Sequence, residues 1–132
     1  MASIVFDRRK FAELILFFTK GSEGDRLFGS TKLNKLLWYA DFLAYGHMGR
    51  PITGATYVHQ EHGPTPKPEQ LLSARDELIK QGRLRVEEEE TYNGTKKRLV
   101  ALDEPDLTLF TEAELDLCQD ALESFRRMSN IE

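Results

Sequence analysis

The sequence predicts an α+β domain that is mainly helical and winged-helix-like, with about four helices around a central apolar helix and one β-hairpin wing. Four segments repeat their apolar residues with the period of an amphipathic or buried helix. Between the third and fourth of them, over residues 83–102, the period changes to that of a strand. The chain has 132 residues, 40% apolar and 30% charged, which is typical of one globular domain. Residues 1–132 are therefore predicted to form a single domain.

The first predicted helix begins after Asp7, because the short carboxylate of an aspartate suits the N-cap position. Phe6 precedes this cap and can pack on Phe11 as a hydrophobic staple. Gly21 is expected to end the helix. The apolar stripe at i, i+3, i+4 and i+7 consists of Phe11, Leu14, Ile15 and Phe18.

The second predicted helix runs from Ser30 or Thr31 to about Tyr45, and Gly46 is expected to stop it. It is apolar on nearly every side, so we expect neighbours all around it. Lys32 and Lys35 are exceptions on one face, with Tyr39 one turn further along that face. The apolar positions are Leu33, Leu36, Leu37, Trp38, Ala40, Phe42, Leu43 and Ala44.

Residues 47–68 are predicted to be a stiff connection without secondary structure, since prolines restrict both themselves and the residues before them. Gly63 and Pro64 mark a turn towards the next helix. One interpretation is a simple connector; the other is a preorganised loop whose tip presents Tyr57, His59 and His62. The prolines of this segment are Pro51, Pro64, Pro66 and Pro68.

The third predicted helix begins near Pro66 or Pro68, because proline suits a first helical turn, and it ends at Gln81 before Gly82. Its predicted buried face consists of Leu71, Leu72, Ala74, Leu78 and Ile79. The fourth helix begins at Thr111 with a capping box to Glu114 and a staple from Phe110 to Leu115. Its stripe consists of Leu115, Cys118, Leu122 and Phe125.

The β-hairpin is predicted to turn at Asn93–Gly94, the preferred pair for a type I′ turn. This turn would place Glu90 opposite Lys97, Glu89 opposite Arg98 and Thr91 opposite Lys96. Opposite charges would then face each other across the two strands. The side chains predicted to face the core are Leu84, Val86, Leu99 and Ala101.

The charge pattern disfavours nucleic acid as a partner. The net charge is −4, with +3 in residues 1–50 and −7 in residues 51–132. The third helix and the hairpin resemble a recognition helix and wing, but both carry acidic and basic residues. A DNA-binding regulator therefore stays as the alternative to a protein-binding module. The basic N-terminal part would favour an acidic patch on a protein partner.

No motif of a known catalytic or cofactor site is present, so the sequence predicts no enzyme activity and no cofactor. It lacks a nucleophile elbow, a phosphate-binding loop and the H-E-x-x-H zinc signature. His47, His59 and His62 are the weaker metal-site hypothesis, because neither a helix nor a strand is predicted to hold them. The single Cys118 forms no intramolecular disulfide and is expected to be a buried apolar residue. No apolar run approaches the ~20 residues of a membrane span, and a cytoplasmic location is expected.

Two segments, 32-KLNKLLWYAD-41 and 50-RPITGATYVHQEHGPTP-66, follow the order K-x-x-KLLYFAD, PITG-x-x-Y and GP-x-P. In this order and spacing the chain resembles the Panacea domain, also called the SocA-like antitoxin domain, which has phage-associated GepA-like members. The resemblance covers about residues 6–128. The matching positions are Lys32, Lys35, Leu36, Leu37, Tyr39, Ala40, Asp41, Pro51, Thr53, Gly54, Tyr57, Gly63, Pro64 and Pro66.

The resemblance implies an antitoxin that binds a toxin protein encoded by an adjacent gene, and at least one relative delivers its toxin to a protease. It implies no catalytic residue and no cofactor. Members often continue with a further helical segment after the position of Phe125, so this chain is either a short member or a truncated one. The predicted partner-binding residues are Lys32, Lys35, Tyr39, Tyr57, His59, His62, Gly63 and Pro64.

Overall fold

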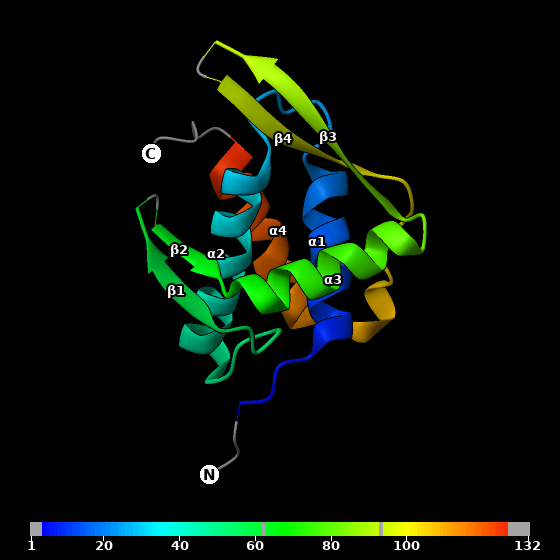
Figure 1. Cartoon of the computed structure of the whole chain (residues 1–132). Helices are drawn as coiled ribbons and strands as arrows, with labels where there is room; N and C mark the ends of the chain where they lie inside the picture. The colour runs from blue at the N-terminus through cyan, green and yellow to red at the C-terminus, as the bar shows by residue number, and fades with distance from the viewer. Residues whose placement is uncertain (1–3, 62, 93, 127–132) are drawn as a thin grey trace.

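The computed structural model describes residues 4–61, 63–92 and 94–126 (Figure 1). None of the helices in these ranges is long and apolar enough to cross a membrane. In chain order the elements are α1 (Arg8–Gly21), α2 (Ser30–Met48), β1 (Tyr57–Gln60), β2 (Gly63–Pro66), α3 (Pro68–Lys80), β3 (Leu84–Thr91), β4 (Gly94–Ala101), the 3-10 helix η1 (Leu107–Leu109) and α4 (Glu112–Arg126).

The fold is mainly helical α+β, which confirms the predicted class, but it contains two antiparallel hairpins instead of one. The β1–β2 hairpin packs beside α2, and the β3–β4 hairpin lies across ends of α1 and α2 (Figure 1). The prediction that residues 47–68 lack secondary structure was wrong, because Val58 pairs with Thr65 and His59 with Pro64. Prolines usually indicate loops, yet an edge strand tolerates them since its outer N–H groups need no partner.

The predicted helix starts are confirmed. Asp7 caps α1 by accepting a hydrogen bond of 3.0 Å from the backbone N–H of Lys10. In the capping box of α4, Glu114 N–H donates to Thr111 Oγ1 at 3.1 Å, and Thr111 N–H donates to Glu114 Oε1 at 2.9 Å. These signals involve residues three positions apart, so the sequence contains all of the information they need.

The C-terminal end of α2 differs from the prediction, because the helix continues through Gly46 to Met48. Gly49 is the C-cap instead, with a φ of +75° and an N–H that donates to the carbonyl of Tyr45 at 2.9 Å. A glycine inside a helix lowers its stability by only about 1 kcal/mol, so Gly46 does not have to end α2. The helix can continue for three residues and end at Gly49, which takes the left-handed conformation of a C-cap.

The core lies between α1, α2 and α4, with α3 and the two hairpins packed against them (Figure 1). Of these helices α1 is the most completely buried, whereas α2 leaves one side open. Helix α3 buries Ala74 and Leu78 but leaves Leu72 and Ile79 each 42% exposed, so their predicted burial was wrong. Helix α3 packs on α1 and β3 along a narrow stripe, and its outer side faces away from both.

The hairpin register differs from the prediction by two residues. Thr91 pairs with Gly94, Glu89 with Lys96 and Glu87 with Arg98. Asn93 of the predicted turn lies outside the described residues, while Gly94 has a φ of +117° and already belongs to β4. A shift of two leaves every side chain on its predicted face. The four core-facing residues are therefore confirmed: Leu84 opposite Ala101 and Val86 opposite Leu99.

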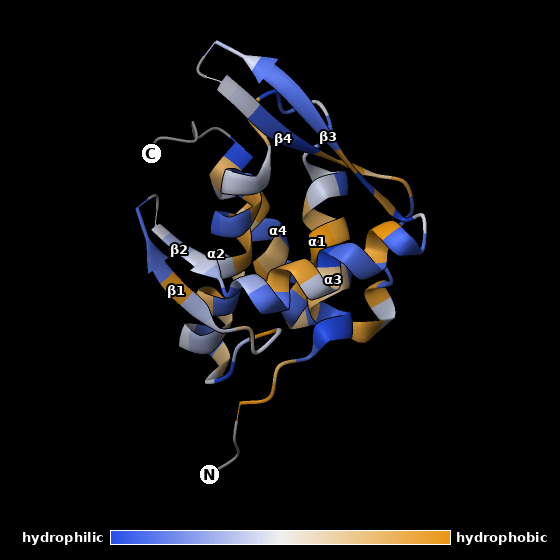
Figure 2. Cartoon of the chain, in the orientation of Figure 1, coloured by the Kyte–Doolittle hydropathy of each residue, from blue (hydrophilic) through white to orange (hydrophobic). Residues whose placement is uncertain are grey.

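The hairpin is polar away from this base, as its colouring in Figure 2 shows. Glu87, Glu88, Glu89 and Glu90 are all exposed, in agreement with a solvated ladder of charges. Glu89 and Arg98 do approach, at 3.9 Å, but diagonally rather than as the directly opposite pair that was predicted. Exposed pairs of this kind contribute little to stability.

Cys118 lies in the core on α4, as predicted, and this burial raises the pKa of its thiol to about 12. At pH 8 only about one thiol in ten thousand would then be the reactive thiolate. We therefore expect no labelling of the folded protein by an alkylating reagent, and complete labelling in denaturant, both measured by mass spectrometry. Rapid labelling in native buffer would contradict the burial.

The same pKa shift sets a pH dependence of stability. The folded state holds the Cys118 proton more tightly than the unfolded chain does, so the contribution is fully present below the ordinary pKa of 9.0. It is lost as the pH rises from there towards about 12.

Candidate protein-binding face

The motif residues Asp41, Thr53 and Tyr57 form a buried hydrogen-bond network. The Asp41 carboxylate accepts bonds of 2.8 Å from the N–H groups of Ile52 and Thr53 and one of 2.6 Å from the Thr53 hydroxyl. The Tyr57 hydroxyl lies 2.7 Å from Asp41 Oδ2 and 3.0 Å from the carbonyl of Leu37. Burial, together with the charge of Asp41, raises the pKa of Tyr57 well above its usual value. The network ties residues 52–57 to α2.

Gly54 extends this network to the N-terminal stretch of the chain. Its φ is +74°, and a Cβ atom there would overlap the carbonyl group of Val5. The N–H of Asp7 donates to the carbonyl of Thr53 at 2.8 Å, which holds the two segments together. Only glycine combines this backbone conformation with so close an approach. Asp41, Thr53, Gly54 and Tyr57 therefore serve the architecture.

Lys32 is also an interior residue, only 2% exposed, with its Nζ 2.7 Å from Asp25 Oδ2. Burial raises the pKa of Asp25, but the bonds from Lys32 and from the N–H of Leu27 outweigh it, and the net pKa lies below the usual value. Tyr39 is half-buried and meets the ring of Phe125 edge-on at 5.3 Å. The expectation that Lys32 lies on an open face was wrong, since its ammonium points inward.

An aromatic stripe of Trp38, Phe42 and Tyr45 occupies the open side of α2. Trp38 stacks on Phe42 with ring centroids 5.1 Å apart. Phe42 is 57% and Tyr45 58% exposed, so the prediction of neighbours on nearly every side of α2 was wrong. The three residues recur at i, i+4 and i+7, which places them on one side of the helix. In the described structure Trp38 is half-buried, whereas Phe42 and Tyr45 stay open.

A groove of about 440 Å³ begins one turn before the stripe, between α2, the β1–β2 hairpin and α3. It brings together Lys35 and Pro64, two of the predicted partner-binding residues. Its polar wall consists of Thr31, Asn34, Lys35, Gln60 and Thr65. Its apolar wall consists of Pro64, Pro66, Pro68, Leu71 and Leu72.

The histidines are not assembled into one site in the described structure. His47 lies exposed near the end of α2, His59 is exposed on β1, and His62 lies outside the described residues. Gly63, also predicted to contact a partner, is half-buried at the start of β2. Over residues 4–61, 63–92 and 94–126 no group of three potential ligands is placed to hold a metal ion.

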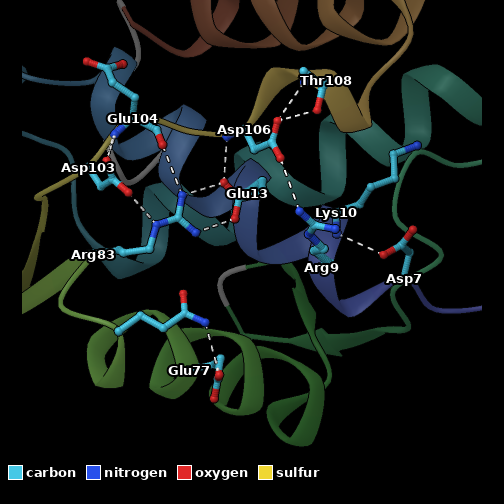
Figure 3. Close-up of polar contacts among 11 residues, drawn as sticks. Asp7, Arg9, Lys10, Glu13, Glu77, Arg83, Asp103, Glu104, Asp106 and Thr108 are labelled. Atoms are coloured by element: carbon cyan, nitrogen blue, oxygen red, sulfur yellow. Dashed lines mark hydrogen bonds and ion pairs between the residues drawn. The ribbon is translucent and has the colours of Figure 1, made fainter.

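A second cleft, of about 500 Å³, lies between α1 and α3 and ends at a charged cluster that sequence reasoning missed (Figure 3). Arg83 donates to both carboxylate oxygens of Glu13, at 2.6 and 2.8 Å, and to Asp103 at 2.7 Å. The N–H of Asp106 donates to Glu13 Oε1 at 2.7 Å. The Glu13 bonds, more than any other contact, raise the pKa of Arg83. The two central charges are thus satisfied within the protein.

The family model of the antitoxin SocA-like, Panacea domain matches residues 33–132. No curated protein and no solved structure matches the chain. The matched range begins inside α2 and includes the aromatic stripe, both hairpins and every lining residue of the groove except Thr31. The resemblance noted above also included α1. Because the match covers most of its length, the chain belongs to the SocA-like antitoxin family with a Panacea domain.

Proposed function

We propose that the protein is an antitoxin that neutralises a toxin by binding it directly through the open side of α2. The observation that carries the proposal is the aromatic stripe within the family-matched region, in which Phe42 and Tyr45 are exposed and Trp38 is half-buried. Aromatic side chains supply much of the binding energy of protein interfaces, because they bury a large area with few rotatable bonds. In a stable interface the stripe would form the desolvated centre, and Lys35 and His59 would lie nearer its rim.

The chemistry of this face favours a protein over nucleic acid. The stripe carries no charge, and a phosphate backbone is recognised mainly by clustered lysine and arginine. The outer side of α3 carries Asp76 as well as Lys80, and β3 exposes four consecutive glutamates. Sequestering a toxin needs one binding face only, whereas delivering it to a protease needs a second. The partner is expected to be encoded by the adjacent gene.

The proposal predicts that Phe42→Glu abolishes rescue when the protein is coexpressed with the adjacent open reading frame. A buried charge at the centre of an interface should weaken binding by about 2 kcal/mol or more, roughly 30-fold in Kd. The measurements are growth, copurification and calorimetric titration. Leu102→Glu is the control, because Leu102 is 48% exposed and lies outside the face.

The outcomes of the coexpression experiment separate the mechanisms. Rescue with a stable complex that Phe42→Glu disrupts supports sequestration through this face. Rescue without any complex would point to toxin degradation or to repression of transcription. A neighbour that is not toxic, or a wild-type protein that does not rescue growth, would overturn the antitoxin proposal.

A further inference from the structure

We propose that the groove between α2, β2 and α3 binds an extended, acidic segment of the partner that inserts one apolar side chain. This inference rests on the proposed function and adds the kind of chain the toxin must present. Two features of the groove decide the mode of binding, the edge of β2 and the unsatisfied polar atoms on its two helices.

The edge of β2 excludes the simplest alternative, which is the addition of a third strand to the hairpin. Pro64 and Pro66 have no N–H, and residues two apart in a strand direct their backbone groups to the same edge. Because β1 already pairs with the other edge, the outer edge of β2 has no donor at either position. A partner strand could not form a regular ladder there. The partner must therefore be held by its side chains.

The size and apolar wall of the groove fit one large side chain. Its volume of about 440 Å³ exceeds that of a single leucine or phenylalanine, so it would also hold neighbouring backbone. Leu72 is 42% exposed and stands on α3 opposite the polar residues of α2. Burying an apolar side chain of the partner against this wall would favour binding, because it removes apolar area of both molecules from water.

Two polar atoms at the groove and its rim lack a hydrogen-bond partner in the described structure, one a donor and the other an acceptor. Arg75 lies one turn after Leu71 and Leu72 on α3, and its Nε is buried without a hydrogen-bond partner in the described residues. Asn34 Oδ1, in the wall formed by α2, is likewise buried and unpartnered there. Leaving such buried groups unsatisfied destabilises the protein, because each has given up its bonds to water. If these two side chains rotate towards the groove when it is occupied, a peptide with an acidic side chain supplies a carboxylate for Arg75 and a backbone N–H for Asn34.

Charge complementarity selects an acidic segment over a basic one. Lys35 lines the groove from α2, Arg75 follows the lining residue Leu71 by one turn on α3, and none of the ten lining residues is acidic. A carboxylate that meets either cation in a partly desolvated groove forms a charge-assisted hydrogen bond. A basic segment would instead place like charges together.

The test compares Leu72→Asp with Ile79→Asp. Leu72 and Ile79 are each 42% exposed and lie on the outer side of α3, but only Leu72 lines the groove. We expect Leu72→Asp to raise the Kd for the purified product of the adjacent reading frame by on the order of 10-fold or more, and Ile79→Asp to change it less than about twofold. Leu72→Ala introduces no charge and should weaken binding less than Leu72→Asp, so it shows whether the effect depends on an intact fold. Circular dichroism checks that all three variants are folded.

Charge reversal provides a second pair of variants. Lys35→Glu should weaken binding by about 10-fold and Lys80→Glu, which is exposed outside the groove, by less than about twofold. An array of overlapping peptides from the same gene product should identify acidic segments with an aromatic or aliphatic residue, bound by wild type but not by Leu72→Asp. Binding by basic peptides would overturn the inference.

The two proposals fail in different ways. If wild type binds and rescues but Leu72→Asp and Lys35→Glu bind equally well, the groove inference is wrong and the antitoxin role stands. If wild type neither binds nor rescues, the antitoxin role itself is wrong.

Discussion

Replacing Asp41 by alanine is expected to lower the free energy of unfolding by roughly 3–5 kcal/mol. Asp41 is only 4% exposed, and its carboxylate accepts four hydrogen bonds, from Ile52, Thr53 and Tyr57. Alanine would leave two backbone N–H groups without their acceptor in the interior. Each unsatisfied buried donor costs about 1–3 kcal/mol, and a bond to a charged group is worth more than a neutral one.

The measurement is urea denaturation followed by circular dichroism, with Asp76→Ala as the control because Asp76 is exposed on α3. Asp41→Asn should fall between wild type and Asp41→Ala. Its amide oxygen can still accept the two backbone bonds, while the hydroxyls of Thr53 and Tyr57 must turn to accept from its NH₂ group. If Asp41→Ala were as stable as Asp76→Ala, the network would not hold residues 52–57 on α2.

Replacing Glu13 by alanine is expected to destabilise the protein by about 3–5 kcal/mol, because it removes one partner of a largely buried ion pair. Glu13 is 4% exposed and binds Arg83 through both oxygens, and it also accepts the N–H of Asp106 (Figure 3). Without it, the Arg83 guanidinium keeps Asp103 but loses its bidentate partner. The loop from Asp103 to Asp106 would also lose its bond to Glu13 and, within the described residues, would keep only the exposed contacts of α1 to Glu104 and Asp106.

Thermal and urea unfolding measure this effect, and Glu104→Ala is a matched control in the same cluster. The side chain of Glu104 is 75% exposed, and Arg83 contacts only its backbone carbonyl, which the substitution retains. Both substitutions remove one negative charge, so a difference between their free energies of unfolding reports on the burial and bonding geometry of the Glu13 carboxylate. Equal stabilities would show that the Glu13–Arg83 pair contributes no more than a surface pair.

Local signals in the sequence predicted the elements well. The cap at Asp7 and the capping box at Thr111 depend on residues at most three positions away. The same is true of Pro68 at the start of α3 and of the left-handed Gly82 after it. These features depend on residues within one helical turn of each other, so the sequence predicts them without knowledge of the tertiary contacts.

The predictions of helix ends and strand pairing were wrong where the local sequence allows two alternative structures. Gly46 and Gly49 could each end α2, and a hairpin around Gly94 could pair in either of two registers that share the same faces. The sequence of β1 and β2, with its two prolines, resembles a loop unless the partner strand is known. In each case local propensity alone does not separate the choices.

The sequence by itself determined the mainly helical α+β class, the ends of most helices and the family to which the chain belongs. Only the tertiary structure decided which charged residues lie inside and which apolar residues stay outside. It buries Lys32 against Asp25 and joins Glu13 to Arg83 across 70 positions, while it leaves Phe42 and Tyr45 on the surface. The physical reason is that periodicity records which residues share a face of a helix, but not whether another element covers that face.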